Sequence, residues 1–247
     1  MIQQYPLLGE QPVAVRPGSS VLDYRVAEFR NRFPDRPPAK LRRFLRRKKQ
    51  FDLMVASVVV VPAVVVVLTA MLLVRLTSKG PSLYSQKRVG RYGRVFTIWK
   101  IRSMYHNCEG HTGPQWSTPG DPRVTRLGKI LRQLHIDELP QLWNVFRGEM
   151  SLIGPRPERP EIVEDLRLSI FGYDVRHQVK PGITGFAQIH LPPDSNILTV
   201  HNKLVYDRYY ISRMGLRLDL RILAATALKV VGLRKLYQRP PRNRAGV

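Results

Sequence analysis

The sequence predicts a mixed, helix-rich α+β fold: a small globular domain with an apolar membrane helix on its N-terminal side and amphipathic helices at the membrane interface. Three observations predict this class. Residues 53–74 carry no charged side chain. Two strand-like stretches follow, around Ser82 to Gln86 and Val95 to Arg102, and a helical pattern runs around Val124 to Leu134. Short strands mixed with helical periods are typical of an α+β domain.

The apolar run, LMVASVVVVPAVVVVLTAMLLV, would reach about 33 Å as a helix, which is enough to enter or cross a bilayer. Pro62 lies near its middle, where it removes one backbone hydrogen bond and presses on the carbonyl of Val58. The sequence therefore predicts a helix broken or kinked at Pro62. The alternative interpretation is a buried helix of a soluble domain.

Both flanks of this helix are basic. Lys40 to Lys49 places seven cations in ten residues, and near an anionic leaflet each adds about 1 kcal/mol of attraction. Since cations concentrate on the cytoplasmic side, both ends favour the cytoplasm. We therefore predict a re-entrant helix that enters and leaves through one leaflet. The cations that follow the run are Arg75, Lys79, Lys87, Arg88, Arg91 and Arg94.

Four segments follow from these patterns. Residues 1–39 contain many prolines and no sustained apolar period, which predicts a disordered basic extension. Residues 40–79 hold the basic run and the membrane helix, and residues 80–235 form the globular domain. Residues 236–247 are polar and contain proline, so we expect a flexible tail.

An amphipathic helix is predicted near the end of the globular domain. It has a basic face, and it lies either on the membrane or against the core. The apolar residues that recur there at helical spacing are Leu216, Leu220, Leu223, Ala227 and Val230.

The amino-acid composition limits the classes of molecule that the protein is expected to bind. The 247 residues include 41 Lys and Arg but only 18 Asp and Glu, a net charge of +23, which favours nucleic acid, anionic lipid or phosphorylated substrates. The single Cys108 excludes an intramolecular disulfide and a multi-cysteine metal cluster, and it fits a reducing cytosol. We interpret Cys108 as a bystander rather than a nucleophile.

The candidate site lies in the segment LHIDELPQLWNVFRGEMSLIGPRPE, residues 134–158. Asp137 reads as a helix cap, with Pro140 in the first turn, where its missing N–H does no harm. Asp137 and Glu138 would then lie at the positive end of a helix. Asp137 is the better nucleophile candidate, because an Asp is already ionised at neutral pH and needs no base.

An anionic carboxylate can approach a phosphate only where cations neutralise the charge. Lys100 and Arg102 are two residues apart, so on a strand they project from one face. Arg156, fixed between two prolines, offers a bidentate fork to phosphate oxygens. Arg88 and Arg147 are further candidates. Mg²⁺, held by Asp137, Glu138 and phosphate oxygens, would complete the neutralisation.

A series of short motifs, in order, resembles the bacterial sugar transferases, the monotopic phosphoglycosyl transferases that act on polyprenyl phosphate. The resemblance covers about residues 48–231. Its motifs are the basic run, Phe51-Asp52, Gly80-Pro81, Gln86 to Gly90, Phe96 to Met104, Asp137-Glu138, Gly154 to Pro157, Lys180 to Gly185, Tyr206 to Tyr210 and Leu218 to Leu220.

The resemblance implies an enzyme with two steps. Asp137 attacks the sugar-bearing phosphorus of a nucleotide diphosphate sugar, taken as a UDP-sugar, and expels UMP. Undecaprenyl or another polyprenyl phosphate then accepts the phosphosugar. Glu138 would assist as a metal-site neighbour or as a base, while Lys100, Arg102 and Arg156 line the phosphate pocket. Pro181, Gly182, Thr184 and Gly185 would form a pocket wall, although a plain turn explains this loop as well.

The resemblance also implies a place in the cell and a set of partners. The catalytic domain, residues 80–235, would lie on the cytoplasmic face of the bacterial inner membrane, in contact with membrane lipid. It would begin exopolysaccharide, O-antigen or glycoconjugate synthesis. No nucleic acid is expected as a partner, and a homodimer is compatible with this assignment.

Three alternatives stay open. The first is a membrane-tethered binder of nucleic acid or another polyanion, for which the net charge is the only support. The second is a membrane scaffold with the same fold and no catalysis. The third is a transferase without a covalent intermediate, in which Asp137 only holds the metal.

Overall fold

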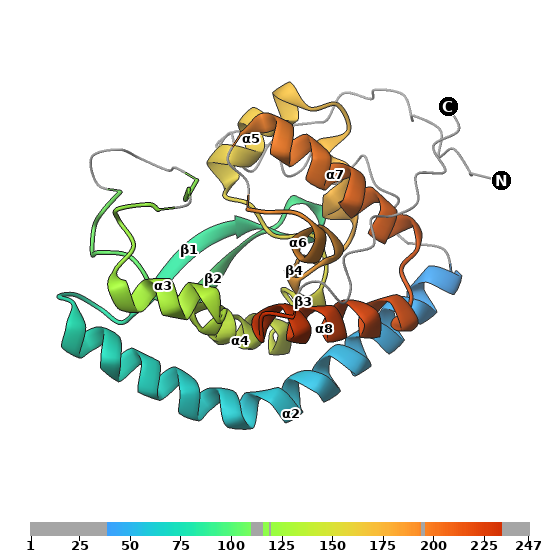
Figure 1. Cartoon of the computed structure of the whole chain (residues 1–247). Helices are drawn as coiled ribbons and strands as arrows, with labels where there is room; N and C mark the ends of the chain where they lie inside the picture. Colours follow the sequence, from blue (N-terminus) through green and yellow to red (C-terminus); the bar gives the residue numbers. More distant parts are fainter. Residues whose placement is uncertain (1–38, 110–115, 119, 194–195, 234–247) are drawn as a thin grey trace, which may run out of the picture.

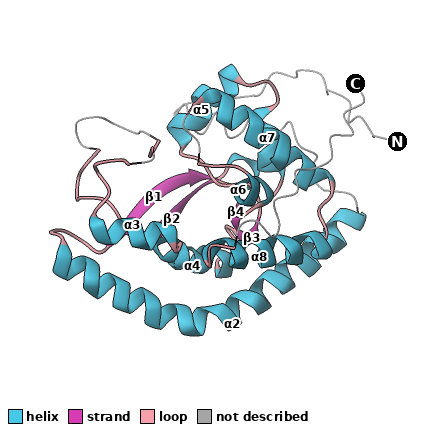
Figure 2. Ribbon diagram, viewed as in Figure 1, coloured by secondary structure: helices cyan, strands magenta, loops and turns pink. Residues whose placement is uncertain are grey.

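The computed structural model describes residues 39–109, 116–118, 120–193 and 196–233. The extension predicted for residues 1–39, except Ala39, and the predicted tail lie outside the described residues. The helix-rich α+β class is confirmed (Figures 1 and 2). In chain order, the elements are α2 (Ala39–Thr77), β1 (Leu83–Val89), η1 (Arg91–Gly93), β2 (Val95–Ile101), α3 (Arg126–Gln133), η2 (Ile136–Gln141), α4 (Leu142–Phe146), β3 (Ser151–Ile153), α5 (Pro160–Ser169), η3 (Tyr173–Gln178), β4 (Gly182–Thr184), α6 (Phe186–His190), α7 (Ile197–Ser212) and α8 (Leu216–Val230), where η marks a 3-10 helix.

Helix α2 runs through Pro62 without interruption. Figure 1 shows it bowed, with its convex side turned away from the rest of the fold. A proline removes one backbone hydrogen bond, and this long helix absorbs the loss by bending. The helix is thus curved, but the predicted break is wrong. Within the described residues, α2 is the one helix long and apolar enough to cross a membrane, which indicates membrane association.

One narrow face of α2 packs on the domain. Ala56, Ala63 and Ala70 are buried and spaced by seven residues, so they share a face and let neighbouring elements approach closely. Valines and leucines cover most of the remaining surface and are exposed, among them Val58 and Val61. An apolar surface of this extent indicates contact with lipid or protein.

The predicted strands are confirmed as the antiparallel pair β1 and β2, in which Tyr84 pairs with Lys100 and Arg88 with Phe96. Strands β3 and β4 form a separate parallel pair. The helical pattern around Val124 to Leu134 is confirmed as α3, where Thr125 accepts a hydrogen bond from the N–H of Gly128 at 2.9 Å.

The amphipathic helix is confirmed as α8, but its buried face differs from the predicted stripe. Asp219, Ile222 and Ala225 face the core, whereas Leu220 is exposed. The reason is that Asp219 has a buried cation as partner, so a charged side chain takes a core position.

That partner belongs to a buried polar cluster, which we call the clamp: Lys48, Asp52, Ser151, Tyr210 and Asp219. Lys48 Nζ lies 2.7 Å from Asp219 Oδ2 and 3.6 Å from Asp52 Oδ1. The hydroxyl of Ser151 donates to Asp52 at 2.7 Å, and that of Tyr210 donates to Asp219 at 2.9 Å. All five residues are buried. The clamp therefore joins α2 to β3, α7 and α8.

Candidate active site

The two adjacent carboxylates lie at the start of η2, and both are buried. The cap position belongs to His135, whose φ is +56°, and no side chain caps this helix. The prediction that Asp137 is the cap is therefore wrong. The helix begins two residues earlier than predicted and is a 3-10 helix, which places Asp137 and Glu138 in its first turn.

Glu138 is held by two cations from different elements. Lys100 of β2 donates to Glu138 Oε1 at 2.7 Å. Arg156, in the turn after β3, donates to Oε1 at 2.5 Å and to Oε2 at 3.3 Å. Burial alone would raise the pKa of Glu138, but Arg156 and Lys100 outweigh it and hold the pKa well below its usual range. Glu138 therefore stays ionised.

Asp137 has the opposite environment. Its carboxylate lines a cavity and makes no hydrogen bond or ion pair with any other residue that the structure describes. Burial raises its pKa to about 6, Lys100 partly offsets this, and the charge of Glu138 adds to it. Two neighbouring carboxylates with pKa values pushed apart are typical of a catalytic pair with divided roles. Asp137 is the one that faces the cavity without a partner.

The cavity has a volume of about 780 Å³, within the range of small-molecule sites. It extends from the two carboxylates along β1 and β2, under the segment after β2, and to α6 and α8. Its lining includes Tyr84, Arg88, Lys100, Trp116, Arg132, His135, Asp137, Glu138, Arg156, Arg159, Gln188 and Lys229.

Arg102 does not extend along the strand face with Lys100. It follows the last residue of β2, where the chain leaves the sheet, and its guanidinium turns back to the end of α2. It donates to the carbonyl of Lys79 at 2.5 Å and to the carbonyl and hydroxyl of Ser78 at 2.9 and 2.7 Å. Arg102 borders the cavity, but its hydrogen bonds hold the connection between α2 and β1.

The two further cations predicted for the site, Arg88 and Arg147, lie in different places. Arg88 lines the cavity beside Glu158, with 3.6 Å between Nη1 and Oε2. Arg147 follows α4, and its largely exposed side chain pairs with Glu149 at 3.4 Å. The structure thus brings Arg88 to the carboxylates and leaves Arg147 outside the cavity lining.

The loop of Pro181, Gly182, Thr184 and Gly185 is absent from the cavity lining. Its glycines allow close approach between two chain segments rather than approach to a ligand. A Cβ on Gly182 would lie 2.1 Å from the backbone nitrogen of Gly154, and one on Gly185 would lie 2.1 Å from the carbonyl oxygen of Gly154. The loop therefore supports the turn that carries Arg156, and it is not a wall of the described cavity.

Sequence reasoning missed several residues that line the cavity. Arg132 of α3 donates to Ser103 at 2.8 Å and to Ser117 at 2.7 Å, which ties α3 to the segment after β2. His135 is two residues before Asp137, and that proximity was an available signal. Trp116 and Lys229 carry no such signal, because only the tertiary fold brings them to the carboxylates.

The donor set fits Mg²⁺ only in part. Within the described ranges, no group of three or more His, Cys, Asp or Glu side chains could hold a metal ion. The oxygens of Glu138 already accept from Lys100 and Arg156, whereas Asp137 presents an unpaired carboxylate to the cavity. Mg²⁺ commonly binds through one or two carboxylates together with substrate phosphates. Asp137 is therefore a better candidate ligand than Glu138.

Comparisons with known proteins show the family to which the chain is similar. The bacterial sugar transferase family matches residues 42–233. The UDP-N-acetylgalactosamine-undecaprenyl-phosphate N-acetylgalactosaminephosphotransferase of Aeromonas hydrophila is 42% identical over 179 residues, 72% of this chain and 42% of that protein. The undecaprenyl-phosphate glucose phosphotransferase of Komagataeibacter xylinus is 39% identical over 196 residues, 77% of this chain and 37% of that protein.

A third relative matches along more of its own length. The UDP-glucose:undecaprenyl-phosphate glucose-1-phosphate transferase of Caulobacter vibrioides is 35% identical over 221 residues, 89% of this chain and 79% of that protein. The chain thus spans about two fifths of the first two relatives and most of the third. Because the family match extends over most of the sequence and includes every element of the site, the chain belongs to the bacterial sugar transferase family.

Proposed function

We propose that this protein transfers a phosphosugar from a UDP-sugar to undecaprenyl phosphate, through a covalent phosphosugar on Asp137. One observation carries the proposal: Asp137 is an unpaired carboxylate in a cavity of about 780 Å³, beside a Glu138 that two cations neutralise. The names of the relatives, which include UDP-glucose and UDP-N-acetylgalactosamine, support the donor class.

In the first step, a carboxylate oxygen of Asp137 attacks the sugar-bearing phosphorus. The bond from this phosphorus to the bridging oxygen breaks, and UMP leaves with the electron pair. Lys100, Arg156 and Arg88 lie where they can neutralise the diphosphate. Because Glu138 holds Lys100 and Arg156 in place, these cations need little reorganisation when the substrate binds.

In the second step, an oxygen of undecaprenyl phosphate attacks the same phosphorus. The acyl phosphate bond breaks, and Asp137 regains its carboxylate. The product is undecaprenyl diphosphate sugar. When bound at Asp137 and the substrate phosphates, Mg²⁺ would neutralise further charge on the oxygens. Glu138 acts here by orienting cations, since its own oxygens are occupied.

We further propose that α2 is re-entrant and holds the domain on the cytoplasmic face of the inner membrane. Basic residues flank its apolar run on both sides, and its bowed shape keeps both ends near the domain (Figure 1). In this position the protein would catalyse the first membrane step of exopolysaccharide, O-antigen or glycoconjugate synthesis.

The test is the intact mass of detergent-purified protein after incubation with Mg²⁺ and a panel of UDP-sugars, without undecaprenyl phosphate. We expect one donor to add the mass of one phosphosugar, and undecaprenyl phosphate to discharge it. Turnover with lipid but without an adduct would contradict the covalent step. No adduct and no turnover with any donor would contradict the proposed function.

The pKa of Asp137 predicts the pH dependence of donor attack. Only the ionised carboxylate can attack, so activity is lost when the pH falls through its pKa. Because that pKa is raised to about 6, kcat/KM for the donor should fall tenfold per pH unit below about pH 6 and level off above it. A pH profile checks this. Lys100→Gln removes a cation that favours the ionised form, so it should move the break to higher pH. A break near pH 4 would contradict the assignment.

A further inference from the structure

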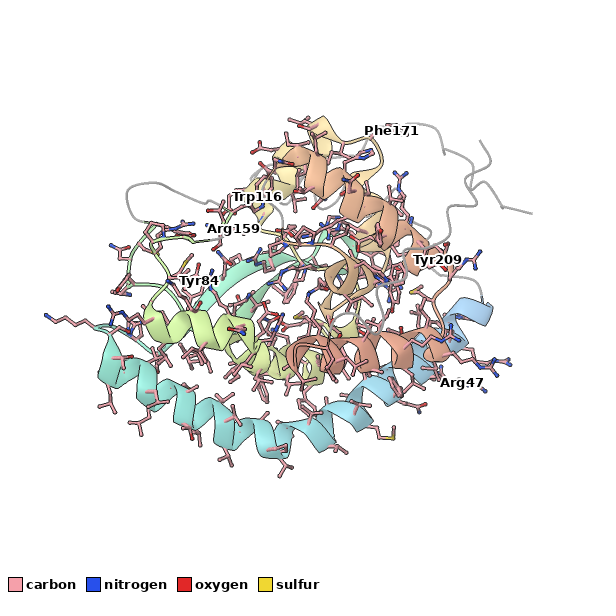
Figure 3. All side chains as sticks on the ribbon, in the orientation of Figure 1. Arg47, Tyr84, Trp116, Arg159, Phe171 and Tyr209 are labelled. Carbon is pink, nitrogen blue, oxygen red and sulfur yellow. The ribbon has the colours of Figure 1, made fainter. Side chains whose placement is uncertain are left out.

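The cavity has two ends that differ in chemistry. One end is aromatic and polar, with Tyr84, Trp116 and Arg159, and Figure 3 shows Trp116 and Arg159 well away from α2. The other end is formed by His135, Gln188 and Lys229, with the apolar residues 191–193 beside them. His135 is the N-terminal cap residue of η2, and η2 packs directly against α2. The second end is therefore on the side of the membrane helix.

The position of Lys229 is fixed within this end of the cavity. It lies in the last turn of α8 and is half-buried. Its ammonium donates to the carbonyl oxygen of Gln188 at 2.6 Å, which spans the gap between α8 and α6. An ammonium has three donors and is a compact charge, well suited to a phosphate.

His135 supplies the second group. Its φ of +56° is unusual for a residue with a Cβ, and such backbone strain clusters at functional sites. Its Nδ1 is buried and has no hydrogen-bond partner among the described residues. A buried polar atom of this kind costs free energy unless a ligand or water satisfies it. His135 also lines the cavity, so its ring can contact a ligand there.

Exposed apolar side chains flank both residues in the chain. Leu134 precedes His135, and Val231 and Leu233 follow Lys229, with exposed fractions of 40%, 67% and 51%. Leu191, Pro192 and Pro193 line the cavity together with Lys229, and apolar surface near a fixed cation fits an amphiphile, with an anionic head and an apolar chain.

We propose that Lys229 and His135 bind the phosphate of the lipid acceptor, an isoprenoid phosphate monoester, with its chain over Leu134 and Val231. The donor diphosphate then occupies Lys100, Arg156 and Arg88. This inference rests on the proposed function. It gives each anionic substrate its own cations, so the acceptor phosphate can approach the phosphosugar on Asp137 without displacing the groups that bound the donor.

The test compares Lys229→Met with Arg221→Met, which removes an exposed charge from the same helix outside the cavity lining. For Lys229→Met, KM for undecaprenyl phosphate should rise about 10- to 100-fold. The donor KM and the rate of adduct formation without acceptor should stay within about twofold. Lys229→Arg should retain most of the affinity. His135→Gly, which tolerates the positive φ, should also raise the acceptor KM.

A binding measurement separates this inference from the proposed function. Calorimetric titration with farnesyl phosphate needs no donor and no turnover, and farnesol and inorganic phosphate control for the chain and the head. Weaker binding of farnesyl phosphate to Lys229→Met than to Arg221→Met supports the acceptor site even if no sugar is transferred. Unchanged binding and acceptor KM in both Lys229→Met and His135→Gly would overturn it. So would a rise in donor KM alone, because Lys229 would then belong to the donor site.

Discussion

Asp137→Asn is expected to lower the rate of phosphosugar transfer by a factor on the order of 10⁴ or more, with the fold intact. An amide has the shape of the carboxylate but cannot form the acyl phosphate. The structure also predicts that the variant folds. The carboxylate of Asp137 holds no partner among the described residues, so its replacement leaves the pairs of Glu138 with Lys100 and Arg156 in place.

Stability should even rise slightly above pH 6, because a buried charge is replaced by a neutral group. The measurements are single-turnover transfer, intact mass with the productive donor, and thermal unfolding. Asp165→Asn, on an exposed position of α5, is the matched control and should behave as the wild type. An Asp137→Asn protein that still forms the adduct would exclude this residue as the nucleophile. Normal turnover would exclude any essential role of its charge.

Lys48→Met is expected to destabilise the protein by about 3–5 kcal/mol. The change keeps the length of the side chain but leaves two buried carboxylates, Asp52 and Asp219, without their shared cation. Uncompensated buried charge is among the largest single-residue effects on the free energy of unfolding.

Lys49→Met is the matched control, since Lys49 is the exposed neighbour on the same helix. It should change the free energy of unfolding by less than about 0.5 kcal/mol. Thermal unfolding in detergent should show the contrast, with a loss of roughly 6–20 °C for Lys48→Met. Adding Asp219→Asn to Lys48→Met should restore part of the loss. Equal melting temperatures for the two single variants would mean that the clamp contributes nothing to stability.

Local patterns in the sequence predicted β1, β2, α3 and α8, but not β3, β4 or the helices α5 to α7. The strand stretches, α3 and α8 follow from residue type and period within ten or so neighbours, and such signals are mostly local. The apolar run predicted α2 but not its continuity at Pro62. Whether a proline interrupts or bends a helix depends on the elements that pack against it, and these come from other parts of the chain.

The candidate site was predictable where the residues that carry the chemistry are close together in the sequence. Asp137 and Glu138 stand side by side, and Arg156 and Lys100 do meet Glu138. Arg102 was misplaced because alternation along a strand holds only to its end, which is Ile101. Glycines at 182 and 185 correctly indicated close approach, but the sequence could not say that the approaching group was Gly154. Lys48 and Asp219, 171 residues apart, meet only in the folded chain.

The clamp also bears on how the protein meets a substrate that diffuses within a bilayer. Lys48 and Asp219 fasten α2 to the domain. If α2 lies in the membrane as proposed, the height and tilt of the cavity above the lipid surface are set when the chain folds. If the acceptor is a membrane lipid, its search is then confined to two dimensions and to one approach direction. The entropy cost of orienting the cavity toward the acceptor would then arise once, during folding and insertion, rather than in every encounter with an acceptor molecule.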